Sequence, residues 1–269
     1  MSQFQYTHVV KAIPAKFMTT QSVGNILATR PQVVGPNGAE DATAKRFAIS
    51  EVSIHNRAGD SAACGVAVRL PIDLWTAGQW VDATTTYTDD TTDAQDAGAD
   101  FALGTTTDDD GFCVFCAVPF NVLSVIVSTA VAGGTVTTTL EYTQAGGTWA
   151  AITNAFSAPV LTATGEALIW FAPPQDWAVS EAGHGTGVPL GQYGIRVTSA
   201  SGSLSAGGVA TLMVLGYSLY PTEGIADNNV ALVTNEGETP MLPQGDALCA
   251  VISEANPQNR ADVKYRMRA

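Results

Sequence analysis

Short runs of β-branched and aromatic residues, broken about every ten residues by glycine, asparagine, aspartate or serine, extend through most of this chain. Residues 47–54 alternate apolar and polar side chains, which is typical of a half-buried strand. Residues 112–118 and 122–127 predict two core strands with Pro119 at the corner between them, because proline cannot donate to a central ladder. The pattern as a whole predicts an all-β fold, a sandwich or a barrel.

The same pattern divides the chain into four segments. We expect an extended N-terminal arm over residues 1–45, which prolines interrupt and which gains its order from contact with a partner. A smaller N-terminal β unit follows over residues 46–110, with a long polar insertion at its end. The sandwich itself occupies residues 111–220, and a C-terminal segment with a basic tail occupies residues 221–269.

Composition excludes two classes of protein. Hydrophobic residues make up 46% of the chain and charged residues 14%, against about 25% charged in an average soluble domain, so the chain is not intrinsically disordered. Its longest apolar runs are shorter than the roughly 20 residues that cross a bilayer. The first residues lack a basic segment followed by an apolar stretch, so we expect no secretory signal and a chain that stays in the cytoplasm unless an assembly carries it.

Charge is distributed unevenly along the chain. Lysine and arginine are absent from residues 70–195, which contain fourteen acidic residues, and the net charge of the whole chain is −13. Such a region repels phosphates, which argues against direct binding of nucleic acid. A basic group near the C-terminus is the candidate electrostatic anchor for docking on a partner, with a solvated tail as the alternative: Arg260, Lys264, Arg266 and Arg268.

Residues with catalytic chemistry are few. The three histidines have no spacing that makes a metal pair, and the glycine-rich residues 183–187 lack the Lys-Ser/Thr of a phosphate-binding loop. No G-x-S-x-G nucleophile motif occurs. Cys113 and Cys116 form a C-x-x-C, but within a strand residues three apart point to opposite faces, so we expect buried free thiols. The sequence therefore predicts a protein that is not an enzyme.

Two groups in the first half of the chain are candidate binding residues. The acidic insertion concentrates carboxylates that could bind calcium, without the register of an EF-hand; aspartates used as turn formers are the alternative. The candidate calcium ligands are Asp89, Asp90, Asp93 and Asp96. No other cofactor is expected. Trp75, Trp80 and Tyr87 lie close enough in sequence to make a sugar-binding platform, although core packing explains them equally well.

Three motifs resemble a known group of virion proteins. Residues 135–152 combine a strand, Glu-Tyr, a glycine turn and a tryptophan; residues 168–177 place prolines between two tryptophans; residues 191–198 contain a Tyr-Gly-Ile-Arg-Val strand. Together they cover about a quarter of the chain. In this arrangement they are similar to the β-sandwich modules of tailed-bacteriophage virions.

The resemblance implies a jelly-roll-like antiparallel β-sandwich without catalytic residues. It also implies architectural roles, with Trp149, Trp170 and Trp177 filling the sandwich and Arg196 pairing with an acid at its edge. The expected protein is a virion component assembled in the host cytoplasm, most simply a capsid decoration (cement) protein that docks through its terminal segments. Its partners would be the major capsid protein or other virion subunits and further copies of itself, with a trimer favoured and no membrane. A tail or baseplate component and a carbohydrate-binding attachment module are the alternatives.

Overall fold

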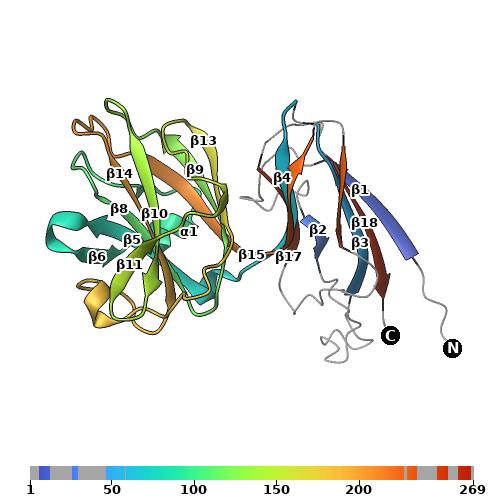
Figure 1. The fold of residues 1–269 in the computed structure, drawn as a ribbon, viewed down its shortest axis with the longest axis horizontal. Helices are drawn as coiled ribbons and strands as arrows, with labels where there is room; N and C mark the ends of the chain where they lie inside the picture. Colours follow the sequence, from blue (N-terminus) through green and yellow to red (C-terminus); the bar gives the residue numbers. More distant parts are fainter. Residues whose placement is uncertain are drawn as a thin grey trace. The chain divides into compact units, whose positions relative to one another are not determined.

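The backbone is described over seven stretches of the chain in the computed structural model (Figure 1): residues 6–12, 26–29, 47–57, 59–226, 229–234, 247–253 and 260–267. Two compact units make up the fold. Unit 1 contains Met1–Leu70 and Ser218–Ala269, whereas unit 2 contains Pro71–Tyr217. Unit 1 therefore includes both ends of the chain, and unit 2 is inserted between its two parts.

Unit 2 is an antiparallel β-sandwich, which confirms the predicted fold class. Its first sheet has six strands in the order β11-β10-β14-β8-β5-β6. Their bounds are Trp75–Val81 (β5), Thr86–Asp89 (β6), Gly111–Cys116 (β8), Thr137–Gln144 (β10), Thr148–Ala151 (β11) and Tyr193–Ala200 (β14). The pairs β10–β11 and β5–β6 are neighbours both in sequence and in this sheet.

The second sheet of unit 2 has the order β12-β13-β9-β15, and β7 also pairs with β15. Its strands are β7 (Phe101–Ala102), β9 (Val122–Thr129), β12 (Ala155–Ser157), β13 (Gly165–Phe171) and the first part of β15 (Val209–Ile225). The predicted corner at Pro119 lies between β8 in the first sheet and β9 in the second. Across the sandwich, the rings of Phe101 and Phe112 pack edge to face with centroids 6.0 Å apart.

Only short helices interrupt the strands of unit 2: η1 (Ile72–Leu74), η2 (Asp82–Thr84), α1 (Thr91–Gln95) and η3 (Ala182–His184). Of these, η2 ends at the first residue of the long polar insertion expected over residues 84–110, and α1 lies within that insertion. Because β5 pairs with β8 from Trp75 to Trp80 and unit 2 begins at Pro71, residues 71–110 belong to the sandwich. The division of the chain therefore differs from the expected β unit over residues 46–110.

Unit 1 contains strands from both ends of the chain. One sheet has the order β1-β18-β3-β16, with bounds Tyr6–Ala12 (β1), Phe47–His55 (β3), Val230–Thr234 (β16) and Arg260–Met267 (β18). The other contains β4, β17 and β2 in this order, with β15 next to β4. These strands are β2 (Ile26–Thr29), β4 (Ala62–Arg69) and β17 (Ala247–Ile252).

The terminal segments differ from the expected arm and tail. Within residues 1–45, β1 pairs with β18 and β2 pairs with β17, so the described parts of the arm are strands of unit 1. The remainder of residues 1–45 lies outside the described residues. Within residues 221–269, β18 lies between β1 and β3 rather than at a free end. Each pairing joins segments more than 200 residues apart, which local patterns do not reveal.

Candidate functional site

The two faces of the six-stranded sheet carry different side chains. Phe112 of β8 contacts Phe101 of the second sheet, so its face is the interior of the sandwich. Neighbouring residues in a strand point to opposite faces, so Cys113 lies on the outer face. In the strand register Cys113 is opposite Arg196, and Arg196 is opposite Glu141. This row places a cation and a carboxylate on the outer face of the sheet.

Arg196 is held from several sides. Its guanidinium carbon lies 4.8 Å from a ring centroid of Trp80 and 4.8 Å from one of Trp149. Its Nε and Nη2 both donate to Glu141 Oε2, at 2.8 and 2.6 Å. Asp82 is a more distant neighbour, with Oδ1 4.0 Å from Nη1. The Arg196 side chain is 13% exposed, and its pairing with an acid confirms the sequence prediction.

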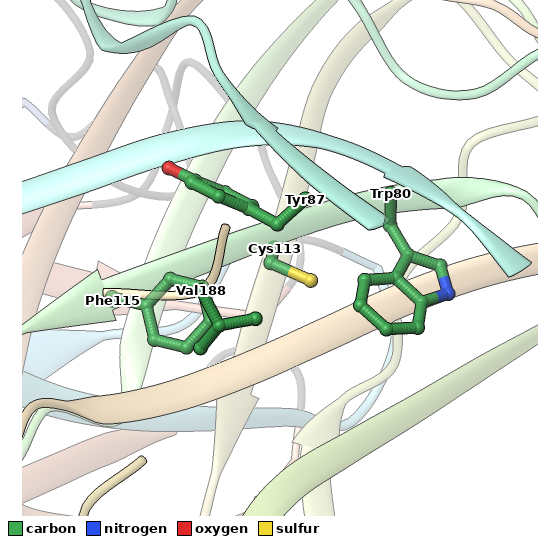
Figure 2. Packing of buried hydrophobic residues seen from close by; sticks show 5 residues of the cluster. All are labelled: Trp80, Tyr87, Cys113, Phe115 and Val188. Atoms are coloured by element: carbon green, nitrogen blue, oxygen red, sulfur yellow. The ribbon is translucent and has the colours of Figure 1, made fainter. Parts of the chain in front are cut away.

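A group of buried residues, the outer cluster, lies beside this ion pair on the same face. Figure 2 shows its five members: Trp80, Tyr87, Cys113, Phe115 and Val188. Trp149 packs against the cluster, and its ring meets that of Trp80 edge to face at 6.0 Å between centroids. Tyr87 and Phe115 make a similar contact at 5.3 Å. Unit 2 thus has a second, smaller core outside the sandwich.

The glycine-rich residues 183–187 contribute to covering the outer cluster. Within them His184 is 1% exposed, and its Nδ1 accepts a hydrogen bond from the Glu181 backbone N–H at 2.9 Å. Trp149 Nε1 donates to the carbonyl of His184 at 3.0 Å. Tyr87 N–H donates to the carbonyl of Thr186 at 2.8 Å. Glycine is required where this segment meets the turn after β10, since a Cβ on Gly147 would lie 2.6 Å from the Cα of Gly183.

The described cysteines are buried free thiols, as predicted. Cys113 and Cys116 lie on opposite faces of β8, and Cys64 of β4 is also free. Burial raises the pKa of Cys113 and of Cys116, and it raises the pKa of Cys64 to about 12. Because the thiolate is the nucleophile and the metal ligand, these protonated thiols are inert near neutral pH. The side chain of Cys249 lies outside the described residues.

The four candidate calcium ligands belong to a described part of the chain, and they do not form a group there that could hold a metal ion. Among the residues that the structure describes, no group of three or more histidine, cysteine, aspartate or glutamate side chains could hold a metal ion. Asp89 Oδ1 instead accepts hydrogen bonds from Thr91 Oγ1 at 2.7 Å and from Tyr87 Oη at 3.2 Å, and Asp96 accepts one from the N–H of Gly98. Asp90 precedes α1, where burial and the nearby charge of Asp93 raise its pKa. The alternative, an aspartate that forms a turn, describes Asp96, which accepts from a backbone N–H two residues later, whereas Asp89 lies on β6 and accepts from side-chain hydroxyls.

The aromatic residues considered for sugar binding do not form an exposed platform. Trp75, Trp80 and Tyr87 are 2%, 1% and 4% exposed. The two tryptophans lie on β5, which pairs with β6 on one side and β8 on the other, so they belong to the interior and to the outer cluster. That prediction is wrong for these three residues, because their sheet is covered on both faces.

The candidate docking residues lie within a sheet of unit 1. Arg260, Lys264 and Arg266 are on β18, where Arg260 is opposite Ala12 and Arg266 is opposite Tyr6. Arg268 lies outside the described residues. A solvated tail therefore does not describe the first three residues, since their backbone belongs to a central strand. Their role in docking stays a prediction.

The three tryptophans of the resemblance have different surroundings. Trp170 of β13 is fully buried in the sandwich. Trp177 packs edge to face against Phe120, and its Nε1 donates to the carbonyl of Gly194 at 3.2 Å. Trp149 lies instead on the outer face, against the outer cluster, so the expectation that it fills the sandwich is wrong. The outer cluster was not foreseen, although six consecutive apolar or small residues in β8 are a signal that both of its faces are covered.

The two units differ in net charge. Unit 2 contains fourteen acidic residues and one basic residue, Arg196, whereas unit 1 contains eleven of each sign. Arg196 is largely buried and paired, and His184 is buried, so the exposed ionisable groups of unit 2 are acidic with the exception of tyrosine. Unit 2 thus has a net charge of −13, and unit 1 has a net charge of zero.

Comparison with protein-family models and with curated proteins found no match for this chain. In the part of the chain that the structure describes, no helix has the length and apolar character needed to span a membrane.

Proposed function

We propose that this chain is a non-enzymatic structural protein of a tailed-phage virion, most simply a decoration protein that binds the assembled capsid through unit 1. The observation that carries the proposal is the separation of charge between the units. Unit 1 holds eleven of the twelve basic residues and both chain ends, and unit 2 exposes acidic groups. A protein attached to a shell needs one part that docks and another that stays in solvent, and the two units suit these roles.

The motifs that resemble phage virion modules support the same proposal. They correspond to β10, β11, β13 and β14 of the sandwich in unit 2. Their distinctive residues pack and pair: Arg196 binds Glu141, and Trp170 is fully buried. A module whose distinctive residues are architectural fits a protein that contributes a stable body to a particle. The jelly-roll-like topology and the trimeric state belong to this proposal.

Binding to the shell would by itself give such a protein its effect, which is to stabilise the capsid without catalysing a reaction. A ligand that binds only the assembled shell stabilises it by mass action, by about 2.7 kcal/mol per site at a free concentration of 100 times Kd. The major capsid protein is the expected partner, since decoration proteins act on the assembled lattice. Docking through unit 1 leaves the acidic groups of unit 2 hydrated, which avoids the cost of desolvating them.

Co-sedimentation tests the proposal with the full-length chain and empty capsids of the phage that encodes it, prepared without this protein. We expect saturable binding that weakens at least tenfold when the charges of β18 are removed together by Arg260→Gln, Lys264→Gln and Arg266→Gln. The matched control removes three charges elsewhere in unit 1, Arg30→Gln, Arg57→Gln and Arg69→Gln, and should bind within about twofold of the original chain. Circular dichroism of each variant checks that the strands persist.

The other outcomes distinguish the alternatives. Absence of capsid binding by the original chain overturns the decoration role. Co-sedimentation with purified tails would then identify a tail component, and retention on a glycan array would identify an attachment module. Equal weakening by the β18 variant and by the control would show that net charge, rather than this strand, determines docking.

A further inference from the structure

The exposed acidic residues of unit 2 are dispersed over its loops and strands. They lie before β5, at the end of β6, after α1, in the turn before β8 and in the segment between β13 and β14. The exposed members are Asp73, Asp89, Asp96, Asp100, Asp109, Asp176 and Glu181. A cation-binding site would gather such groups, and among the described residues none are gathered in that way. A dispersed field of one sign acts instead over the whole unit.

Because Arg196 is largely buried, the exposed charges of unit 2 all have the same sign. Its guanidinium lies between Trp80 and Trp149 and donates twice to Glu141. The single positive charge of the unit is thereby neutralised and shielded from approaching molecules. A second copy of unit 2 meets no exposed cation with which to form an ion pair.

We infer that unit 2 is an electrostatic spacer that repels unit 2 of neighbouring copies, whereas unit 1, with a net charge of zero, is free to associate. For free molecules this inference follows from the charges alone. For copies on adjacent sites of a shell it rests on the proposed function. Repulsion between them lowers the affinity of the last empty sites, and this effect weakens with salt because the Debye length falls from about 30 Å at 0.01 M to about 8 Å at 0.15 M.

The size of the effect can be worked from the charges. Asp73, Asp89, Asp96 and Asp100 are exposed, and their replacement by asparagine changes the net charge of the unit from −13 to −9. Repulsion between two copies scales with the product of their charges, so it should fall to about half. Asparagine keeps a side-chain oxygen that can accept the hydrogen bonds that Asp89 and Asp96 receive. The matched control replaces the same four residues by glutamate, which keeps the charge.

Static light scattering of the free, full-length protein provides the first measurement. At 10 mM NaCl we expect a positive second virial coefficient. Its excess over the value at 300 mM NaCl should fall to about half in the four-asparagine variant and stay unchanged in the four-glutamate variant. At 300 mM NaCl the three proteins should agree. Equal coefficients for the asparagine and glutamate variants at low salt would overturn the inference, whatever the protein does on a capsid.

Capsid binding provides the second measurement, at the same two salt concentrations. We expect a shallow isotherm at low salt, with a Hill coefficient below 1, that steepens toward 1 at high salt and in the four-asparagine variant. An isotherm of unchanged shape would refute repulsion between bound copies. Absence of any capsid binding would overturn the proposed function alone, since the scattering result would still stand.

Discussion

Replacing Arg196 by methionine removes the only cation of unit 2 and leaves Glu141 without its partner. The two N–H donors share one oxygen of Glu141, so their loss counts as that of a single charge-assisted interaction and should cost about 1.5–3 kcal/mol. Loss of the two contacts with tryptophan rings adds about 0.5–1 kcal/mol each, and the flexible methionine recovers part of this by filling the gap. Asp82 adds little, because it is 46% exposed and 4.0 Å away. We expect a net loss of about 3 kcal/mol in the free energy of unfolding of unit 2.

Tryptophan fluorescence during urea unfolding measures this change in the intact chain. All five tryptophans lie in unit 2, so the signal reports that unit alone. For a unit of this size a loss of 3 kcal/mol corresponds to a decrease of about 6–12 °C in Tm. The control Asp82→Asn should stay within about 0.5 kcal/mol of the original chain, because its contact with Arg196 is long and exposed.

A double-mutant cycle separates the ion pair from the packing. The pair Arg196→Met and Glu141→Leu removes both charges, so no carboxylate is left without a partner. We expect the double variant to be at least about 1 kcal/mol more stable than the sum of the two single changes predicts. Additivity within about 0.5 kcal/mol, or a cost below that for Arg196→Met alone, would refute the role assigned to this pair.

Two further predictions concern a turn and a carboxylate. Gly147→Ala should destabilise unit 2 by about 2–5 kcal/mol in a thermal melt, because the added Cβ would meet Gly183 at a φ of +73°; Gly146→Ala, with a φ of +86° and open space around it, should lose only about 1–2 kcal/mol, and equal losses would contradict the contact. Hydrogen bonds from Tyr142 and Gln144 lower the pKa of Asp176, so its contribution to stability is present above the ordinary pKa of 3.8 and is lost as the pH falls through the lowered value. Unfolding in urea between pH 5 and pH 2 should therefore show a smaller loss of stability for Asp176→Asn than for the original chain, and identical pH profiles would contradict this role.

Local sequence patterns predicted the features that depend only on residues close together in the chain. The strands β3, β8 and β9 and the corner at Pro119 follow from periodicity and from the missing N–H of proline. The free thiols of Cys113 and Cys116 follow from their spacing within a strand. The prediction failed where a residue's role depends on which segments pack over it, as for Trp149 and the outer cluster.

The pairing of strands that are far apart in the sequence also could not be predicted. Nothing in residues 6–12 identifies residues 260–266 as their partner, because any apolar strand could satisfy the same backbone groups. The terminal segments were accordingly expected to be an arm and a tail. The role of the acidic residues also depends on distant packing. Aspartate serves as a calcium ligand or as a turn former, and only the positions of the carboxylates in space distinguish the two roles.

The pairing of β1 with β18 has a consequence for the order in which the chain matures. During synthesis from the N-terminus, residues 71–217 are complete before β18 (Arg260–Met267) has been made. Because β18 lies between β1 and β3, these two strands have no shared partner until then. The sandwich can therefore fold on the ribosome before residues 260–267 are made, whereas the sheet of unit 1 closes only after them. A chain that stops before β18 would contain all of unit 2 but would lack a strand of the sheet in unit 1. Under the proposed function, particles would incorporate only copies that contain β18.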